Sequence, residues 1–143
     1  MEIRPCAASD FESVVALLQQ LWPEKRLDRA SLRTVFDRAL SSNDQGYLCA
    51  VEGGHVVGFC SMSLENSLWV EGRLAIVEEI VVDARNRGRG IGASLMNAAV
   101  EWSRTHGARR LELDSAHHRK EALRFYERNG FENRGMVFSK SLI

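Results

Sequence analysis

The sequence predicts an α/β protein with a mixed β-sheet, because the spacing of its apolar residues changes period along the chain. Two segments near the amino terminus repeat apolar residues every three or four positions, as amphipathic helices do. Three β-rich runs follow, and helical and strand patterns alternate after them. At 143 residues the chain has the length of one ordinary domain, so we expect a single domain over residues 1–143.

Each expected element has a local cause. The opening strand belongs at a sheet edge, because Pro5 cannot donate to a central ladder. Pro23 ends the first helix, and Gly53-Gly54 is a hairpin signal between two β-rich runs. Gly107 and Gly130 end the last two helices. The expected strands are residues 2–6, 47–51, 56–64, 74–82, 111–114 and a last strand or strand pair in 131–140, and the helices are residues 11–21, 32–40, 91–106 and 119–129.

Composition and charge exclude several classes of protein. Hydrophobic residues make up 45% and charged residues 27% of the chain, the balance of a globular protein. Nineteen basic residues offset nineteen acidic ones, so we expect neither a nucleic acid nor a membrane as partner, and any anion site must be local. The apolar runs are too short for a membrane span, and residues 1–10 lack a signal-peptide core, so the expected location is cytoplasmic.

Cysteine and histidine give no signal for a structural or metal site. Cys6, Cys49 and Cys60 are an odd number and form no C-x-x-C pair, so no disulfide framework is expected. Cys49 and Cys60 fall in apolar runs, where a free cysteine behaves as a small buried hydrophobe. His117-His118 has no third ligand at a recognisable spacing, and we expect no metal.

A glycine-rich stretch between an expected strand and an expected helix predicts an anion site. Glycine lets the main chain approach an anion closely, and the N–H groups of a helix amino terminus point toward it. A P-loop is excluded because no G-K-[ST] follows. Two alternatives are a solvated tight turn and a dinucleotide fingerprint with Asp114 near the ribose, although too few βα units follow for the latter. The stretch consists of Arg87, Gly88, Arg89, Gly90, Ile91, Gly92 and Ala93.

Two motifs resemble those of the GCN5-related N-acetyltransferase (GNAT) family. Arg87, Gly90 and Gly92 match R-x-x-G-x-G/A, the family's coenzyme A pyrophosphate loop. Residues 122–131 match its A-x-x-F-Y-x-x-x-G-F signature after a strand in residues 111–113. The resemblance covers essentially the whole chain. It implies a mixed six- to seven-stranded sheet flanked by about four helices and splayed between strands four and five, with acetyl-CoA as acetyl donor.

The resemblance also implies roles for particular residues. Main-chain groups of Ile80, Val81 and Val82 would bind the pantetheine arm of acetyl-CoA, and the glycine-rich stretch would bind its pyrophosphate. Tyr126 would stand beside the thioester sulfur as the general acid. The alternative for Tyr126 is packing on the sheet, which is the role we expect for Phe125.

Glu78 and Glu79 interrupt an apolar strand, where an unpaired carboxylate is costly. Successive strand residues point to opposite faces, so we expect only one of them to face the acceptor. Glu79 matches the family's usual acidic position and is the candidate general base, directly or through water. The alternative is a partnered or edge-exposed pair of glutamates.

The acceptor is expected to be a small-molecule primary amine that attacks the thioester directly. Residues 79–82, the glycine-rich stretch and residues 138–142 are also similar to small bacterial aminoalkylphosphonate N-acetyltransferases. Protein N-termini, aminoglycosides, polyamines and amino acids remain alternatives, as does a catalytically silent acyl-CoA-binding module. A homodimer is one option for the assembly, since dimers are common in the family.

Overall fold

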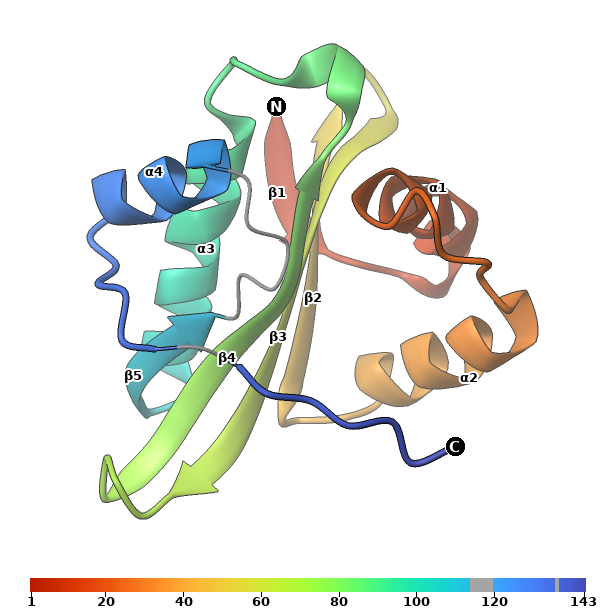
Figure 1. Cartoon of the computed structure of the whole chain (residues 1–143). Coiled ribbons are helices and arrows are strands. Elements are labelled where there is room, and N and C mark those ends of the chain that lie inside the picture. Colours follow the sequence, from red (N-terminus) through yellow and green to blue (C-terminus); the bar gives the residue numbers. More distant parts are fainter. Residues whose placement is uncertain (114–119, 136) are drawn as a thin grey trace.

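The computed structural model describes residues 1–113, 120–135 and 137–143, which form a five-stranded sheet between two pairs of helices (Figure 1). The strand order is β1-β2-β3-β4-β5, with β4–β5 parallel and the other pairings antiparallel. The α/β class with a mixed sheet is confirmed. The strands are β1 (Glu2–Pro5), β2 (Gln45–Glu52), β3 (His55–Ser67), β4 (Gly72–Val82) and β5 (Ala108–Leu113), the helices are α1 (Phe11–Leu21), α2 (Arg29–Leu40), α3 (Ile91–Thr105) and α4 (Lys120–Arg128), and the short 3-10 turns are η1 (Ala8–Asp10) and η2 (Ala84–Asn86).

Helices cover both faces of the sheet, and each interface is a hydrophobic core. Helices α1 and α2 lie on one face, and α3 and α4 lie on the other (Figure 1). The apolar stripes of α1, α2 and α3 contribute buried side chains to these cores, and the strands contribute the rest. The first core includes Phe11, Val14, Leu17, Phe36, Cys49 and Phe59, and the second includes Leu48, Cys60, Met62, Val77, Leu95 and Met96.

Local sequence explains the start of α2 and the β2–β3 hairpin. The Asp28 carboxylate accepts hydrogen bonds from the main-chain N–H groups of Ala30 and Ser31, so α2 begins at Arg29, three residues earlier than expected. Gly53 and Gly54 adopt φ angles of 58° and 79°, which glycine takes without steric cost, and the predicted hairpin is confirmed.

The expectation of a sixth or seventh strand in residues 131–140 is wrong for the described residues. Residues 131–135 and 137–143 contain no strand, and Val137, Phe138 and Leu142 are exposed. The β-rich composition of this segment is only a local preference, because a strand also needs a sheet edge to pair with.

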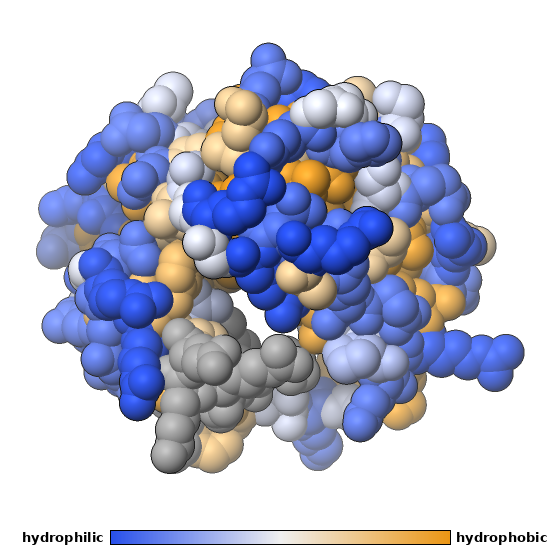
Figure 2. Space-filling model, turned by 90° about the horizontal axis from the view of Figure 1, so that it is seen from above, coloured by the Kyte–Doolittle hydropathy of each residue, from blue (hydrophilic) through white to orange (hydrophobic). Residues whose placement is uncertain are grey.

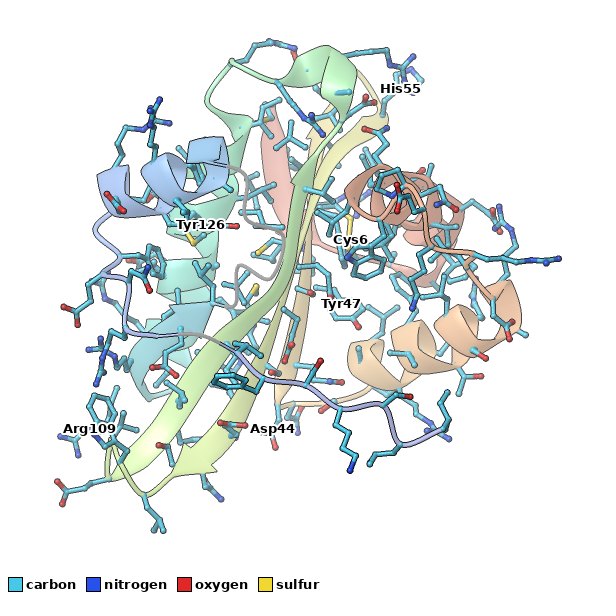
Figure 3. All side chains as sticks on the ribbon, in the orientation of Figure 1. Cys6, Asp44, Tyr47, His55, Arg109 and Tyr126 are labelled. Carbon is cyan, nitrogen blue, oxygen red and sulfur yellow. A yellow bond between two sulfur atoms is a disulfide. The ribbon has the colours of Figure 1, made fainter. Side chains whose placement is uncertain are left out.

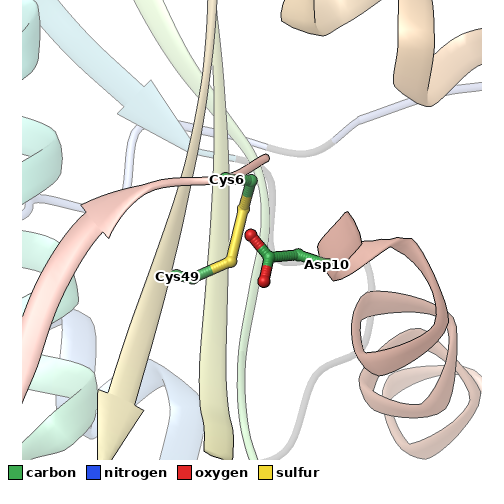
Figure 4. A group of neighbouring side chains, drawn as sticks. All are labelled: Cys6, Asp10 and Cys49. Carbon is green, nitrogen blue, oxygen red and sulfur yellow. A yellow bond between two sulfur atoms is a disulfide. The ribbon is translucent and has the colours of Figure 1, made fainter. Parts of the chain in front are cut away.

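The cysteine expectation is also wrong. Cys6 and Cys49 form a disulfide beside Asp10 (Figure 4). Pairing of β1 with β2 explains it: Arg4 lies opposite Cys49, which brings the two cysteine Cα atoms to 5.5 Å across 43 residues of sequence. Cys60 is free and buried, as expected. Within the described ranges no helix has the length and apolar character needed to span a membrane.

Candidate active site

Strand β4 is paired with β5 over only half of its length. Arg73 to Val77 pair with Ala108 to Leu113, and no described β5 residue pairs with β4 after Val77. This is the splay expected between strands four and five. The main chain of Ile80, Val81 and Val82 therefore pairs with β3 on one side and with no described strand on the other, as pantetheine binding would require.

We call residues 78–82 the unpaired half of β4, because no described β5 residue pairs with them. A β-bulge lies where this half begins. Ser61 of β3 pairs with Glu79 and Met62 pairs with Val77, which leaves Glu78 as the extra residue. An extra residue interrupts the alternation of side chains along a strand. Val77 therefore packs in the second core, on the face covered by α3, while Glu79 lies on the face covered by α1 and α2.

The bulge places both glutamates on one face, which corrects the expectation of opposite faces. The Ser61 hydroxyl donates to Glu79 Oε1 at 2.6 Å, and the Ser63 hydroxyl donates to Glu78 Oε1 at 2.7 Å. Ser61 and Ser63 are two positions apart on β3 and share a face, so their carboxylate partners share it too. Glu78 is exposed, whereas Glu79 is partly buried.

The surroundings of Glu79 favour a carboxylate that holds its proton more strongly than usual. Burial raises the pKa of Glu79, the hydrogen bond from Ser61 opposes that rise, and neighbouring Glu78 adds to it. Burial, Glu79 and Glu78 together raise the pKa of Tyr47 to about 12, so its phenol stays neutral. A carboxylate with a raised pKa is suited to exchange protons near neutral pH.

Tyr126 lies on the other face of the sheet. Its side chain points from α4 toward the sheet, whereas Tyr47 lies on the α1–α2 face (Figure 3). Burial, and to a smaller extent Cys60, raises the pKa of the Tyr126 phenol, so it keeps its proton at neutral pH. Tyr126 packs against the core that contains Cys60, and Ile80, which pairs with Cys60 in the unpaired half of β4, packs against the same core. Burial, followed by Glu79, raises the pKa of the Cys60 thiol to about 12, which makes it a poor nucleophile.

The glycine-rich stretch joins β4 to α3 and leaves the amino terminus of α3 open. Gly90 is the N-cap, with a φ of 81° and no side-chain hydrogen bond to the first turn of the helix. A Cβ added to Gly88 or Gly90 would meet nothing within 4 Å, while one on Gly92 would contact the ring of Phe125 at 3.4 Å. The open positions fit an anion bound by the main-chain N–H groups of Ile91, Gly92 and Ala93.

Arg87 and Arg89 of this stretch are exposed, and each makes hydrogen bonds to neighbouring groups. Arg87 Nε donates to the Val82 carbonyl at 3.2 Å, and Arg89 pairs with Glu52 and Asn86. The loop after β4 lies at the top of Figure 1, and the end of the molecule seen from above in Figure 2 is covered mainly by hydrophilic residues. Arg87 and Arg89 add positive charge close to the N-cap Gly90 in the sequence, and the guanidinium of Arg89 has further N–H donors besides those bonded to Glu52 and Asn86.

Several residues lie beyond what the sequence could assign. No sequence pattern indicates Ser61 as a partner of Glu79, because the two residues are 18 positions apart. Asp114 and His117-His118 lie outside the described residues. One cluster of metal-binding side chain types occurs in the described part of the chain, Cys6, Asp10 and Cys49, but its two sulfurs are bonded to each other and Asp10 accepts two hydrogen bonds from Arg4.

Comparisons with known proteins agree with this arrangement. The model of the acetyltransferase (GNAT) family matches residues 11–131. The aminoalkylphosphonate N-acetyltransferase of Salmonella typhimurium is 33% identical over 141 residues, which cover 99% of this chain and 91% of that protein. The glucosamine 6-phosphate N-acetyltransferase of Trypanosoma brucei brucei is 31% identical over 92% of this chain and 88% of its own. An aminoglycoside N-acetyltransferase in complex with CoA shares the fold, with a TM-score of 0.84 and 21% identity over 99% of this chain and 95% of that one.

Proposed function

Because this chain belongs to the acetyltransferase (GNAT) family, whose enzymes are N-acetyltransferases that use acetyl-CoA, we propose that it acetylates the primary amine of a small molecule by direct attack on the thioester. The observation that carries the proposal is the position of Glu79. It stands at the bulge that begins the unpaired half of β4, with a raised pKa and a serine partner. The relatives named above are acetyltransferases of small amines, which supports a small acceptor.

The chain fits acetyl-CoA at two places. Main-chain groups of Ile80, Val81 and Val82 would hold the pantetheine arm, and the open amino terminus of α3 beyond Gly90 would hold the pyrophosphate. When bound, acetyl-CoA supplies the activated acetyl group. The chain's own task is to hold both reactants and move two protons.

Glu79 and Tyr126 would move these protons. Glu79 accepts the proton of the amine, directly or through water, and so makes the nitrogen nucleophilic. Tyr126 donates a proton to the departing sulfur from the opposite face of the sheet. Cys60 is buried with a raised pKa and Cys6 and Cys49 are joined, so no described cysteine is suited to carry the acetyl group, which favours direct transfer.

Release of free thiol from acetyl-CoA in the presence of an amine panel tests the proposal, with the N-acetylated product identified by mass. The panel includes a peptide with a free N-terminus, which separates a small-molecule acceptor from a protein one. We expect Glu79→Gln to lower kcat/KM at neutral pH and to recover as the free amine deprotonates at higher pH. Glu78→Gln, at an exposed carboxylate, is the control. Acetyl-CoA binding without thiol release for any amine would identify a silent binding module instead.

A further inference from the structure

A small cavity leads to Glu79 on the face of the sheet that α1 and α2 cover. Its volume is about 130 Å³. Three edge-on or tilted aromatic contacts run along its wall, with ring centroids 5.4 Å apart for Phe11–Phe36, 5.6 Å for Phe36–Tyr47 and 5.3 Å for Tyr47–Phe59. Aromatic walls of this kind bind apolar groups, and an engineered apolar cavity of about 150 Å³ binds benzene. The cavity therefore matches one ring or a branched alkyl group.

The charges around the cavity select a cation and disfavour an anion. Glu79 is the one charged side chain among the described residues that line it. The guanidinium of Arg33 stacks on the ring of Phe11 at 4.9 Å, but it also pairs with Asp37 of the same helix. An amine at Glu79 would gain an ion pair, whereas a phosphate or phosphonate in the cavity would lose water with no cation among the described lining residues to replace it.

The cavity opens beside α2. Val35 lines it and is 54% exposed, and Trp22, which follows the end of α1, is only partly buried. An acceptor could therefore enter between these two side chains, with its amine reaching Glu79 and its apolar body held by the aromatic wall.

From the volume, the aromatic wall and the single carboxylate, we infer that the acceptor is a small primary amine with an aromatic or branched alkyl body. The inference rests on the proposed function, since it places the acceptor at Glu79. It sets this chain apart from the two relatives above, whose named substrates carry a phosphonate or a phosphate.

Two amines with the same two-carbon spacer test the inference, 2-phenylethylamine and 2-aminoethylphosphonate. They differ only in the group that would occupy the cavity. We expect kcat/KM, measured by thiol release from acetyl-CoA, to be at least about tenfold higher for the phenyl compound. Equal values, or a preference for the phosphonate, would overturn the inference while the proposed function stands. If no amine of any class released thiol, the proposed function itself would fail.

Two variants locate the effect in the cavity. Trp22→Ala should lower kcat/KM for 2-phenylethylamine by about tenfold and leave ethylamine nearly unchanged, while Trp69→Ala, at a tryptophan that is 63% exposed outside the cavity lining, changes neither. Val35→Arg adds a cation at the opening and should shift the preference toward 2-aminoethylphosphonate. Leu68→Arg adds the same charge at a residue that is 98% exposed and should not. If each variant matched its control, the cavity would not be the acceptor site.

Discussion

Ser61→Ala removes the side-chain partner of Glu79, the carboxylate that we propose as general base. Ser61 is 1% exposed, and its hydroxyl makes two hydrogen bonds with Glu79: it donates to Oε1 at 2.6 Å and accepts from the main-chain N–H at 2.9 Å. Alanine removes both. Because the hydroxyl stabilises the ionised carboxylate, its loss raises the pKa of Glu79 further above the ordinary range.

The size of the effect follows from that hydrogen bond. A hydrogen bond to a charged group contributes about 1.5–3 kcal/mol. We take the lower end because Glu79 is only partly buried. A loss of about 1.5 kcal/mol corresponds to roughly a tenfold smaller ionised fraction wherever Glu79 is mostly protonated. The ratio of variant to wild-type kcat/KM should therefore be about one tenth at acid pH. As pH rises and Glu79 becomes fully ionised in both proteins, the ratio should increase to a constant plateau.

The assay is the pH dependence of kcat/KM for an amine, measured by thiol release. The amine titrates identically with both enzymes, so its own pKa cancels from the ratio. Ser63→Ala removes the equivalent bond to exposed Glu78 and is the matched control, with a ratio that should not vary with pH. A ratio for Ser61→Ala that is constant over the whole pH range would refute the reasoning, because Ser61 would then act only on packing.

Three further predictions concern other parts of the account. Tyr126→Phe should lower kcat by about a hundredfold to ten-thousandfold with acetyl-CoA affinity nearly unchanged, and a loss below about threefold would leave Tyr126 a packing role. Reducing the disulfide between Cys6 and Cys49, which closes a loop across 43 residues, should lower the free energy of unfolding in urea by up to about 4 kcal/mol. Three reactive thiols in protein unfolded without a reductant would contradict the presence of the disulfide. The pKa of Glu79 is higher in the folded protein than in the unfolded one, so ionisation of Glu79 lowers the stability of the fold as pH rises from the unfolded pKa through the folded pKa. Glu79→Gln should therefore raise Tm at neutral pH but not below pH 4. An equal gain in Tm at both pH values would count against this.

The sequence was informative where local pattern determines structure. The glycine-rich stretch, the hairpin at Gly53-Gly54 and the edge position of the strand with Pro5 follow from the conformations these residues allow. The splay also agrees with the family resemblance. These features position the β4 main chain and the α3 amino terminus, where acetyl-CoA is proposed to bind.

The remaining features depend on pairing between distant segments. The bulge at Glu78 arises from the register of β4 against β3, so strict alternation gave the wrong face for one glutamate. The partnership of Ser61 with Glu79 and the bond between Cys6 and Cys49 likewise need the register of neighbouring strands. A local pattern contains no information on register. The strand expected in residues 131–140 was wrong for the described residues because a strand also needs a sheet edge to pair with, which a local pattern does not contain either.

The central claim is that the acetyl group passes directly from acetyl-CoA to an amine beside Glu79. Initial rates measured over a grid of acetyl-CoA and amine concentrations test it most directly. Direct transfer requires both substrates on the enzyme together, so the double-reciprocal lines should intersect, and the intact mass of the protein incubated with acetyl-CoA alone should stay unchanged. Parallel lines, together with a protein that gains one acetyl group before any amine is added, would contradict the account.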